Sequence, residues 1–370
     1  MSVLPVVGAV LIALGVIGTL LPLLPYDDYW IRMWDYPRSQ LAVLLLGGAT
    51  LIAVTIALGH AAPWHRWALG AAVASLAFQV FRIFPYTALA PVQVPAAAGG
   101  EADSAREFRL LVCNVLQDND RYGAFADLVR EVAPDVVLTL ETNHAWADAL
   151  AAEGFTEAFP HHVAVPRENR YGMHLWSRLP LRDAEVLHLV SDSIPSIRTS
   201  LQLPNGHWVK FYGVHPAPPS PTEESGSTGR DAELALVGEL VRDDPGTDVV
   251  VAGDLNDVAW SHSTRLFQRV SGLLDPRRGR GLYSTFHADH WWARWPLDHV
   301  FHARAFQLVS LQRLRHIGSD HFPVSVTLRY VPERQGETEA PVPERDDLEE
   351  AVETVDQARE GKVDGLLIKE

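Results

Sequence analysis

The sequence has little cysteine and no excess of basic charge, and both shortages narrow what the protein can do. Its single cysteine, Cys113, cannot form an internal disulfide. Since Cys113 stands in an apolar run, we interpret it as a small core residue. The 31 basic residues are outnumbered by 46 acidic ones, which gives a net charge of -15. A sequence-independent DNA-binding protein needs a broad basic surface, so this balance disfavours a nuclease and nucleic acid as a partner.

Charged residues are also missing from a long stretch at the N-terminus. Residues 3–24 contain none and can span a hydrocarbon core of roughly 30 Å. Residues 41–58 form a second candidate span, and 67–81 a third that lengthens if Arg82 snorkels. The first run lacks a basic segment before it and a second span follows at once, which argues against a signal peptide. We therefore expect residues 1–85 to be a membrane anchor of about three transmembrane helices.

The charges around these spans give a weak indication of orientation. With three spans, the first loop and the C-terminal domain share one side of the membrane. Arg32, Arg38 and Arg82 lie on that side and Arg66 on the other, which leans towards a cytoplasmic domain. Aromatic residues between the first two spans are typical of a membrane interface: Tyr26, Tyr29, Trp30, Trp34 and Tyr36.

The rest of the chain divides by composition. Residues 86–107 are rich in Pro, Ala and Gly and are interpreted as a linker. Residues 108–330 alternate strand and helix patterns, with amphipathic helices expected at 121–132 and 231–242. Residues 331–370 carry 13 acidic and 5 basic residues, so we expect an acidic, disordered tail with at most a short helix at 346–359.

Six apolar strands of residues 108–330 carry a polar residue at or near one end. The sharpest is the run Asp248-Val-Val-Val-Ala-Gly-Asp254-Leu-Asn256. The others end at or begin with Asn114, Glu141, His215, Asp298 and the pair Asp320-His321. Polar side chains at the ends of buried strands are costly unless they converge on something polar. The pattern therefore predicts one site that holds a metal and an anion.

In this order, these residues resemble the endonuclease/exonuclease/phosphatase superfamily. The phrases RYGMHLWSRLPL, GDLNDVAWS, RWPLDHVFHA and GSDHFPV look like its membrane-anchored bacterial branch. Leu255 departs from the usual Phe conservatively. The resemblance implies an α/β fold, a four-layer sandwich of two mixed sheets flanked by helices, following the N-terminal transmembrane helices. It also implies a divalent-metal-dependent phosphoesterase.

A hard oxygen ligand suits Mg²⁺, with Mn²⁺ as the alternative ion. Glu141 is the expected first metal ligand, with Asn114 and Asp320 completing or bracing the site. The alternative for Glu141 is a carboxylate that caps a helix beginning near His144.

The resemblance also assigns the acid–base groups. Asp254 with Asn256 would orient and deprotonate the attacking water. Asp298 would orient His321, which would bind a phosphate oxygen or move a proton. His215 would face the same phosphate. The sequence leaves open which histidine is the acid.

Three further features have two interpretations each. Arg198 is a candidate phosphate ligand or a solvated strand residue. Arg277, Arg278 and Arg280 form a solvated loop or a second phosphate contact. Trp291, Trp292 and Trp295 either pack under the sheet or form an aromatic rim facing substrate or the bilayer.

Taken together, the sequence predicts a membrane-anchored hydrolase of a phosphorylated, lipid-linked substrate or a phospholipid. The alternatives are a nuclease and a non-catalytic scaffold, and a scaffold would need none of the six motifs. Part of the anchored branch is similar to glycopeptide-resistance phosphatases that act on undecaprenyl pyrophosphate outside the cell. On that resemblance, and against the charge rule, we expect the domain on the extracytoplasmic side of the inner membrane.

Overall fold

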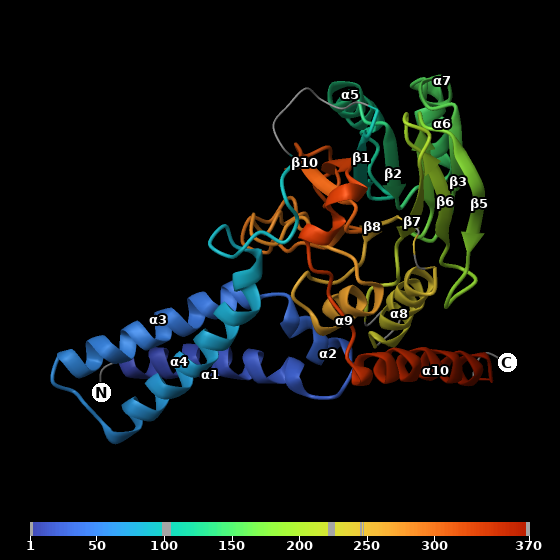
Figure 1. The fold of residues 1–370 in the computed structure, drawn as a ribbon. Helices are drawn as coiled ribbons and strands as arrows, with labels where there is room; N and C mark the ends of the chain where they lie inside the picture. Colours follow the sequence, from blue (N-terminus) through green and yellow to red (C-terminus); the bar gives the residue numbers. More distant parts are fainter. Residues whose placement is uncertain (1–2, 98–104, 221–225, 245, 247, 368–370) are drawn as a thin grey trace.

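The computed structural model describes residues 3–97, 105–220, 226–244, 246 and 248–367, with side chains up to 360. Figure 1 shows a rod of helices joined to an α/β domain. The rod contains α1 (Val3–Leu20), η1 (Leu21–Leu23), α2 (Tyr29–Arg32), η2 (Met33–Asp35), α3 (Arg38–Ala57), α4 (Pro63–Ile83) and η3 (Phe84–Tyr86).

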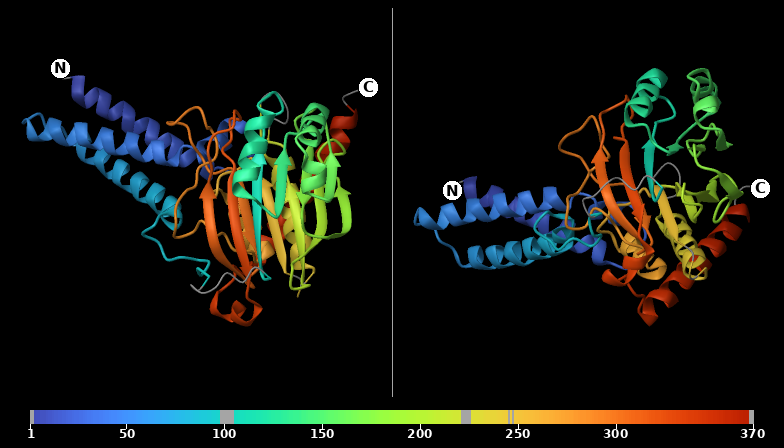
Figure 2. Two further views of the ribbon diagram at one scale, coloured as in Figure 1. Left: turned by 90° about the horizontal axis from the view of Figure 1, so that it is seen from above. Right: turned by 45° about the horizontal axis from the view of Figure 1, so that its top comes forward.

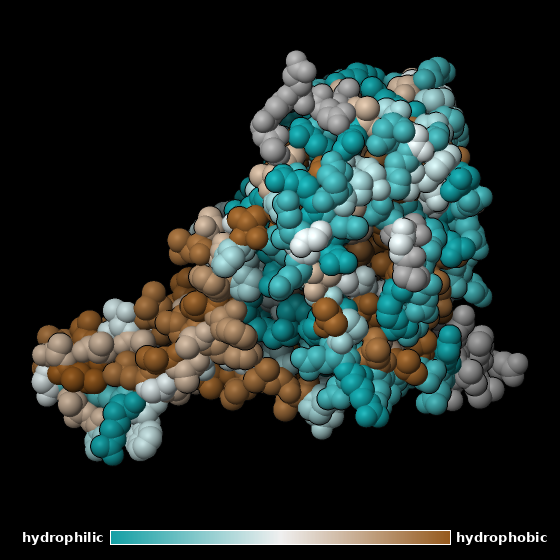
Figure 3. Space-filling model, viewed as in Figure 1, coloured by the Kyte–Doolittle hydropathy of each residue, from teal (hydrophilic) through white to brown (hydrophobic). Residues whose placement is uncertain are grey.

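The three long helices of the rod agree with the three expected spans. Segments Val3–Leu23, Arg38–Ala57 and Pro63–Tyr86 are long and apolar enough to cross a membrane. Their outer side chains form the brown surface of the rod in Figure 3. Small residues let α1 and α3 approach closely, as in many membrane helix pairs.

Two mixed sheets form the centre of the α/β domain. The first has the strand order β10-β11-β1-β2-β4-β3 and the second β5-β6-β7-β8-β9. The β1/β2 and β7/β8 pairs are parallel and the other pairs antiparallel. The strands are β1 (Glu107–Asn114), β2 (Val136–Leu140), β3 (His161–Val165), β4 (Met173–Ser177), β5 (Leu181–Leu187), β6 (Ser196–Gln202), β7 (Trp208–Val214), β8 (Val249–Asp254), β9 (Asp298–His302), β10 (Phe306–Arg313) and β11 (Val324–Tyr330).

The sheets pack face to face, with helices on their outer faces (Figure 2). One core cluster joins the sheets through residues such as Leu138 and Phe211. A second covers the outer face of the first sheet with α5 (Tyr122–Val132), α6 (His144–Ala152) and α7 (Phe155–Ala158). A third covers the other sheet with α8 (Thr228–Arg242) and α9 (His262–Ser271). The predicted four-layer sandwich is confirmed.

The predicted linker is only partly a loose connection. Val94 is fully buried in the core between the sheets, and Ala97 N–H donates to the Leu308 carbonyl on edge strand β10. A segment with one buried apolar side chain and unpaired backbone groups can cover an open sheet edge. Its Pro, Ala and Gly composition alone does not reveal this. Residues 86–97 therefore seat the rod against the domain, and 98–104 lie outside the described residues.

The expectation of a disordered tail is wrong for much of its length. The tail contains η4 (Pro332–Glu337) and α10 (Arg345–Leu367), which includes the short helix expected at 346–359. Ala351 and Val355 are buried against α8 and α9, and Asp347 pairs with Arg269 at 2.7 Å. The apolar stripe of this helix is narrow, so the acidic composition of the tail outweighed it in the sequence-based prediction.

Candidate active site

The strand ends named by the sequence meet at one edge of the sandwich. Asn114 ends β1 in one sheet, while Asp254 ends β8 and Asp298 begins β9 in the other. Asp254 and Asp298 are direct register partners in the β8/β9 ladder. Two sheets that face each other thus present their polar ends to one space.

Gly253 sets the geometry of the central strand end. Its φ is +152°, and a Cβ there would lie 1.8 Å from the Val214 carbonyl oxygen on β7. Only glycine fits, so β7 and β8 approach closely just before His215 and Asp254. The turn that follows is left-handed at Asn256, with φ +50°. Its N–H donates to Asp254 Oδ1 at 2.9 Å and fixes that carboxylate.

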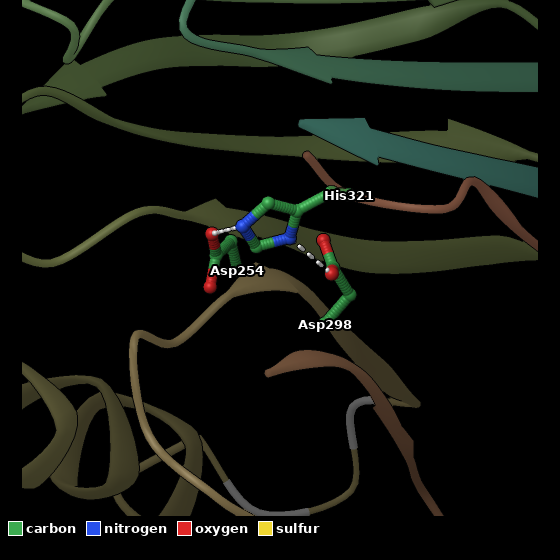
Figure 4. Close-up of side chains that lie close together, drawn as sticks. All are labelled: Asp254, Asp298 and His321. Atoms are coloured by element: carbon green, nitrogen blue, oxygen red, sulfur yellow. Dashed lines mark hydrogen bonds and ion pairs between the residues drawn. The ribbon is translucent and has the colours of Figure 1, made fainter. Parts of the chain in front are cut away.

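Asp254, Asp298 and His321 form a compact buried cluster, drawn in Figure 4. His321 Nδ1 lies 2.8 Å from Asp298 Oδ2, and its Nε2 lies 3.5 Å from Asp254 Oδ2. Burial lowers the pKa of His321, but the two carboxylates outweigh it and raise this pKa to about 10. The imidazole is therefore a cation at neutral pH, held between two acids.

His215 differs from His321 although it reaches the same carboxylate. Its Nε2 lies 3.9 Å from Asp254 Oδ2, and its buried Nδ1 has no hydrogen-bond partner among the described residues. Burial lowers the pKa of His215 to about 4. His215 is therefore neutral at pH 7, so His321 is the one that carries a proton to give.

Asn114 joins Glu141 to this cluster. Its Nδ2 donates to Glu141 Oε1 at 2.9 Å and to Asp254 Oδ2 at 3.1 Å. Glu141 has a left-handed backbone, with φ +60°, a strained conformation that is common at functional sites. Its Oε2 accepts from Gln117 N–H at 3.3 Å, and the N-cap of α6 is Asn143. The alternative that Glu141 caps this helix is thus wrong.

A second glycine, Gly172 in the segment RYGMHLWSRLPL, also allows a close backbone contact. A Cβ at Gly172 would lie 1.8 Å from the Thr142 carbonyl oxygen. Thr142 N–H in turn donates to the Gly172 carbonyl at 3.0 Å. This close approach holds the loop that carries Glu141.

Asp320 lies at the rim of the site. Its carbonyl accepts from Ala288 N–H at 2.6 Å, and its carboxylate, together with burial, raises the pKa of Glu141. Ser319 Oγ donates to the Asn114 carbonyl at 2.7 Å and accepts from His321 N–H at 3.0 Å. Ser319 therefore fastens the Asp320-His321 segment to the end of β1.

Two sequence-based interpretations receive no support from the geometry. Arg198 lies in β6 and forms an ion pair with Glu185 of β5, so its charge already has an acidic partner. Arg277 is neither solvated nor a phosphate ligand, because it is buried and pairs with Asp275 at 2.7 Å. It also contacts His299 Nδ1 at 2.6 Å, one residue past Asp298, so it braces the start of β9.

The tryptophans divide between the two readings. Trp295 is half-buried, with its ring 5.7 Å from that of Tyr36. Trp291 and Trp292 are 79% and 62% exposed. The Trp292 backbone carbonyl accepts a hydrogen bond at 2.8 Å from Nε2 of Gln40, which lies in the first turn of α3.

The sequence reading missed the support that the rod gives to the site. Tyr36 Oη donates to the Asn256 carbonyl at 2.6 Å, and Arg230 Nη1 donates to the same oxygen at 3.1 Å. Trp260 Nε1 donates to the Asp35 carbonyl at 2.7 Å. Tyr36 was interpreted as part of an aromatic belt, and no local pattern signals a contact over 220 residues.

The donor set of the site suits a hard divalent cation. Glu141 and Asp320 offer carboxylates and Asn114 an amide. Asn114 links them to a second group of possible ligands, Asp254, Asp298 and His321. Asp298 Oδ1 is buried and has no hydrogen-bond partner among the described residues. Burial raises the pKa of Asp254 and of Glu141, and a bound cation would favour their ionised forms. Oxygen-rich sites of this kind favour Mg²⁺ or Mn²⁺.

Comparison with known proteins settles the family. A sequence model of the endonuclease/exonuclease/phosphatase family matches residues 111–321. The chain belongs to the endonuclease/exonuclease/phosphatase family. Members of this family are phosphoesterase hydrolases and are generally dependent on divalent metals. No curated protein sequence matches the chain.

Solved structures of the family show the same fold. A humanized TDP2 of D. rerio has 14% sequence identity and a TM-score of 0.50, covering 60% of this chain and 99% of that one. The catalytic domain of human Nocturnin with bound sulfate has 15% identity and a TM-score of 0.50, covering 61% and 95%. The rod of N-terminal helices lies outside the residues that the family model matches.

The contact between Tyr36 and Asn256 predicts a first mutational effect. Tyr36→Phe removes only the hydroxyl, so the Asn256 turn loses one hydrogen bond, which is worth about 1 kcal/mol, or roughly fivefold. The turnover number of the full-length enzyme should fall by about that factor while KM stays unchanged. Tyr26→Phe is the matched control, because Tyr26 is 56% exposed. A change in KM alone would contradict a positioning role.

Proposed function

We propose that this protein is a membrane-anchored, divalent-metal-dependent phosphohydrolase that acts on a lipid-linked phosphate or a phospholipid. The observation that carries the proposal is the seating of the rod on the loop that follows Asp254. Tyr36 and Tyr86 donate to the carbonyls of Asn256 and Ala259, and Arg82 Nη2 donates to the Trp260 carbonyl at 2.9 Å. The site therefore lies beside the end of the membrane-spanning segment.

The side chains of the site supply the groups that phosphoester hydrolysis needs. Asp254, held by Asn256 N–H and Asn114, accepts the proton of the attacking water. His321, kept cationic by Asp298, faces the phosphoryl oxygens or protonates the leaving oxygen. Neutral His215 donates a hydrogen bond to the same phosphate.

Glu141, with Asn114 and Asp320, would hold the metal. When bound, a Mg²⁺ or Mn²⁺ ion would neutralise charge on the phosphoryl group. The same residues position Asp254 through Asn114. Asn114 thus contacts both the proposed metal ligand Glu141 and the proposed base Asp254.

A substrate panel tests this proposal. Full-length protein in detergent is assayed on a lipid pyrophosphate, sphingomyelin, plasmid DNA and a chromogenic phosphodiester, with and without Mg²⁺. We expect Mg²⁺-dependent phosphate release from a lipid substrate and little cleavage of DNA. Faster turnover of DNA than of either lipid would favour the nuclease alternative, and turnover of none would favour a scaffold.

A variant without the exposed indoles refines this panel. Trp291→Ser with Trp292→Ser should spare the chromogenic diester and reduce lipid turnover, since indoles favour the bilayer interface. Trp295 is left unchanged because it packs against Tyr36. Thermal unfolding serves as the stability control. An equal loss on both substrates would contradict an interfacial role.

We further propose that the domain lies on the extracytoplasmic side of the inner membrane. A lipid pyrophosphate exposed there is the substrate class that the family resemblance implies. Cysteine-labelling of an exposed position such as Asp148→Cys should succeed in intact cells with a membrane-impermeant reagent. Labelling only after lysis would place the domain in the cytoplasm and turn the proposal towards cytoplasmic phosphates.

A further inference from the structure

A surface hollow beside the rod contains three arginines without acidic partners. It has a volume of about 510 Å³ and is lined by Arg280, Gly281, Leu282, Tyr283, Ser284, Arg294 and Arg313. In the part of the chain that the structure describes, none of the three arginines forms an ion pair with a carboxylate. The hollow is thus a concentration of positive charge on a protein with a net charge of -15.

Two of these arginines contact the same aromatic ring. The guanidinium carbons of Arg313 and Arg294 lie 4.5 Å and 5.0 Å from the centre of the Phe322 ring. Partial burial and then the charge of Arg294 lower the pKa of Arg313. The two like charges repel each other, and an anion bound beside them would offset the repulsion. The guanidinium fork matches the oxygens of a phosphate.

Backbone carbonyls hold the guanidinium groups of the three arginines in place. Arg313 Nη1 donates to the Ser284 carbonyl at 2.8 Å, and Arg294 Nη2 to the Ala288 carbonyl at 2.8 Å. Arg280 Nη2 donates to the Val94 carbonyl at 2.6 Å. Each arginine thus spends only part of its five N–H donors on the protein. The remaining donors are available to a ligand.

Both walls of the hollow are attached to the ends of membrane-spanning helices. On one side, Gly279 N–H donates to the Pro85 carbonyl at 2.8 Å, in the η3 turn that ends the third span. On the other, the loop of Arg294 is held by Gln40 of α3 through the Trp292 carbonyl. Four exposed apolar side chains belong to these attached segments: Leu89, Val92, Trp291 and Trp292. Figure 3 shows the hydrophobic surface of the rod reaching this junction.

From this placement we infer that the hollow binds the head-group phosphate of an anionic membrane phospholipid. The apolar and indole side chains around it would enter the interface, while the three arginines would meet the phosphate layer. A zwitterionic lipid carries its own cation and leaves less net charge to offset. This inference depends on the anchor lying in a bilayer and is independent of hydrolysis.

Binding of a short-chain lipid tests the inference on the full-length protein. The protein in a neutral detergent, with EDTA to prevent hydrolysis, is titrated calorimetrically with dihexanoyl phosphatidylglycerol, dihexanoyl phosphatidylcholine or inorganic phosphate. Phosphatidylglycerol should bind at least about tenfold more tightly than the other two, the factor of a charge-assisted contact. Equal affinity for phosphatidylcholine would overturn the inference. Equal affinity for inorganic phosphate would show an anion site that does not select lipids, and would overturn it too.

A matched pair of variants locates the binding. Arg313 and Arg315 are exposed residues two positions apart, and Arg315 lies 3.4 Å from Glu131 outside the hollow. Arg313→Gln should weaken phosphatidylglycerol binding by about tenfold, whereas Arg315→Gln should leave it unchanged. Arg294→Gln added to Arg313→Gln should abolish it. If this double variant unfolds at a lower temperature, the comparison of Arg313→Gln with Arg315→Gln decides the outcome. Equal affinities of these two single variants for phosphatidylglycerol would reject the site.

Discussion

Asp254→Asn should lower the turnover number by more than about 100-fold, the scale of a lost general base or charge-stabilising group. The amide keeps the shape of the carboxylate and can still accept from Asn256 N–H, as Asp254 Oδ1 does at 2.9 Å. It cannot take a proton from water at neutral pH. Steady-state kinetics on the best substrate of the panel measure this effect. Asp148→Asn, the same change on an exposed face of α6, should be neutral.

His321→Ala should cost as much as Asp254→Asn, because the imidazolium lies between Asp254 and Asp298. Removing it leaves two buried carboxylates facing each other. A double variant of Asp254 and His321 no slower than either single one would show that they act as a unit. Near-normal turnover of either single variant would reject the assigned roles.

Glu141→Gln should produce the second large effect. The neutral amide can still meet Asn114 Nδ2, which donates to Glu141 Oε1 at 2.9 Å, but it offers a cation no charge. Half-maximal activity should require at least about tenfold more Mg²⁺, since loss of even an outer-shell partner often costs this much. Maximal activity should fall as well.

The control for this variant is Glu157→Gln, an exposed glutamate near the end of α7. Thermal unfolding of both proteins should match that of the parent. An unchanged Mg²⁺ titration curve for Glu141→Gln would remove Glu141 from the metal site. In that case Asp254, Asp298 and His321, whose ligand atoms lie within 4.8 Å of one another, become the candidate metal site.

The residues that meet at this edge of the sandwich could be named from the sequence because their signal is local. Asp254 follows an apolar strand and a glycine, and burial makes a polar residue there conspicuous. The fold followed from the order of such strand ends together with a family resemblance. The two sheets bring Asn114 and Asp254 together although 140 residues separate them.

Other features depend on contacts that leave no local trace. Arg198 has the sequence context of a phosphate ligand, but its partner Glu185 on the neighbouring strand is visible only in the fold. The helix α10 was not predicted at its full length because residues 331–370 contain thirteen acidic residues, whereas the buried apolar stripe includes only a few side chains such as Ala351 and Val355. The hydrogen bond from Tyr36 to Asn256 joins segments that composition assigns to separate parts.

The seating of the rod on residues 256–260 has a consequence for what the enzyme can reach. Hydrogen bonds from Tyr36, Tyr86 and Arg82 hold this loop against the rod of apolar helices. With the rod in a bilayer, the carboxylates of the site stay at one height above the lipid head groups. The rate then depends on substrate per unit of membrane area instead of per unit of solution volume. Diluting the substrate lipid within the bilayer should slow the reaction, while diluting the vesicles should not.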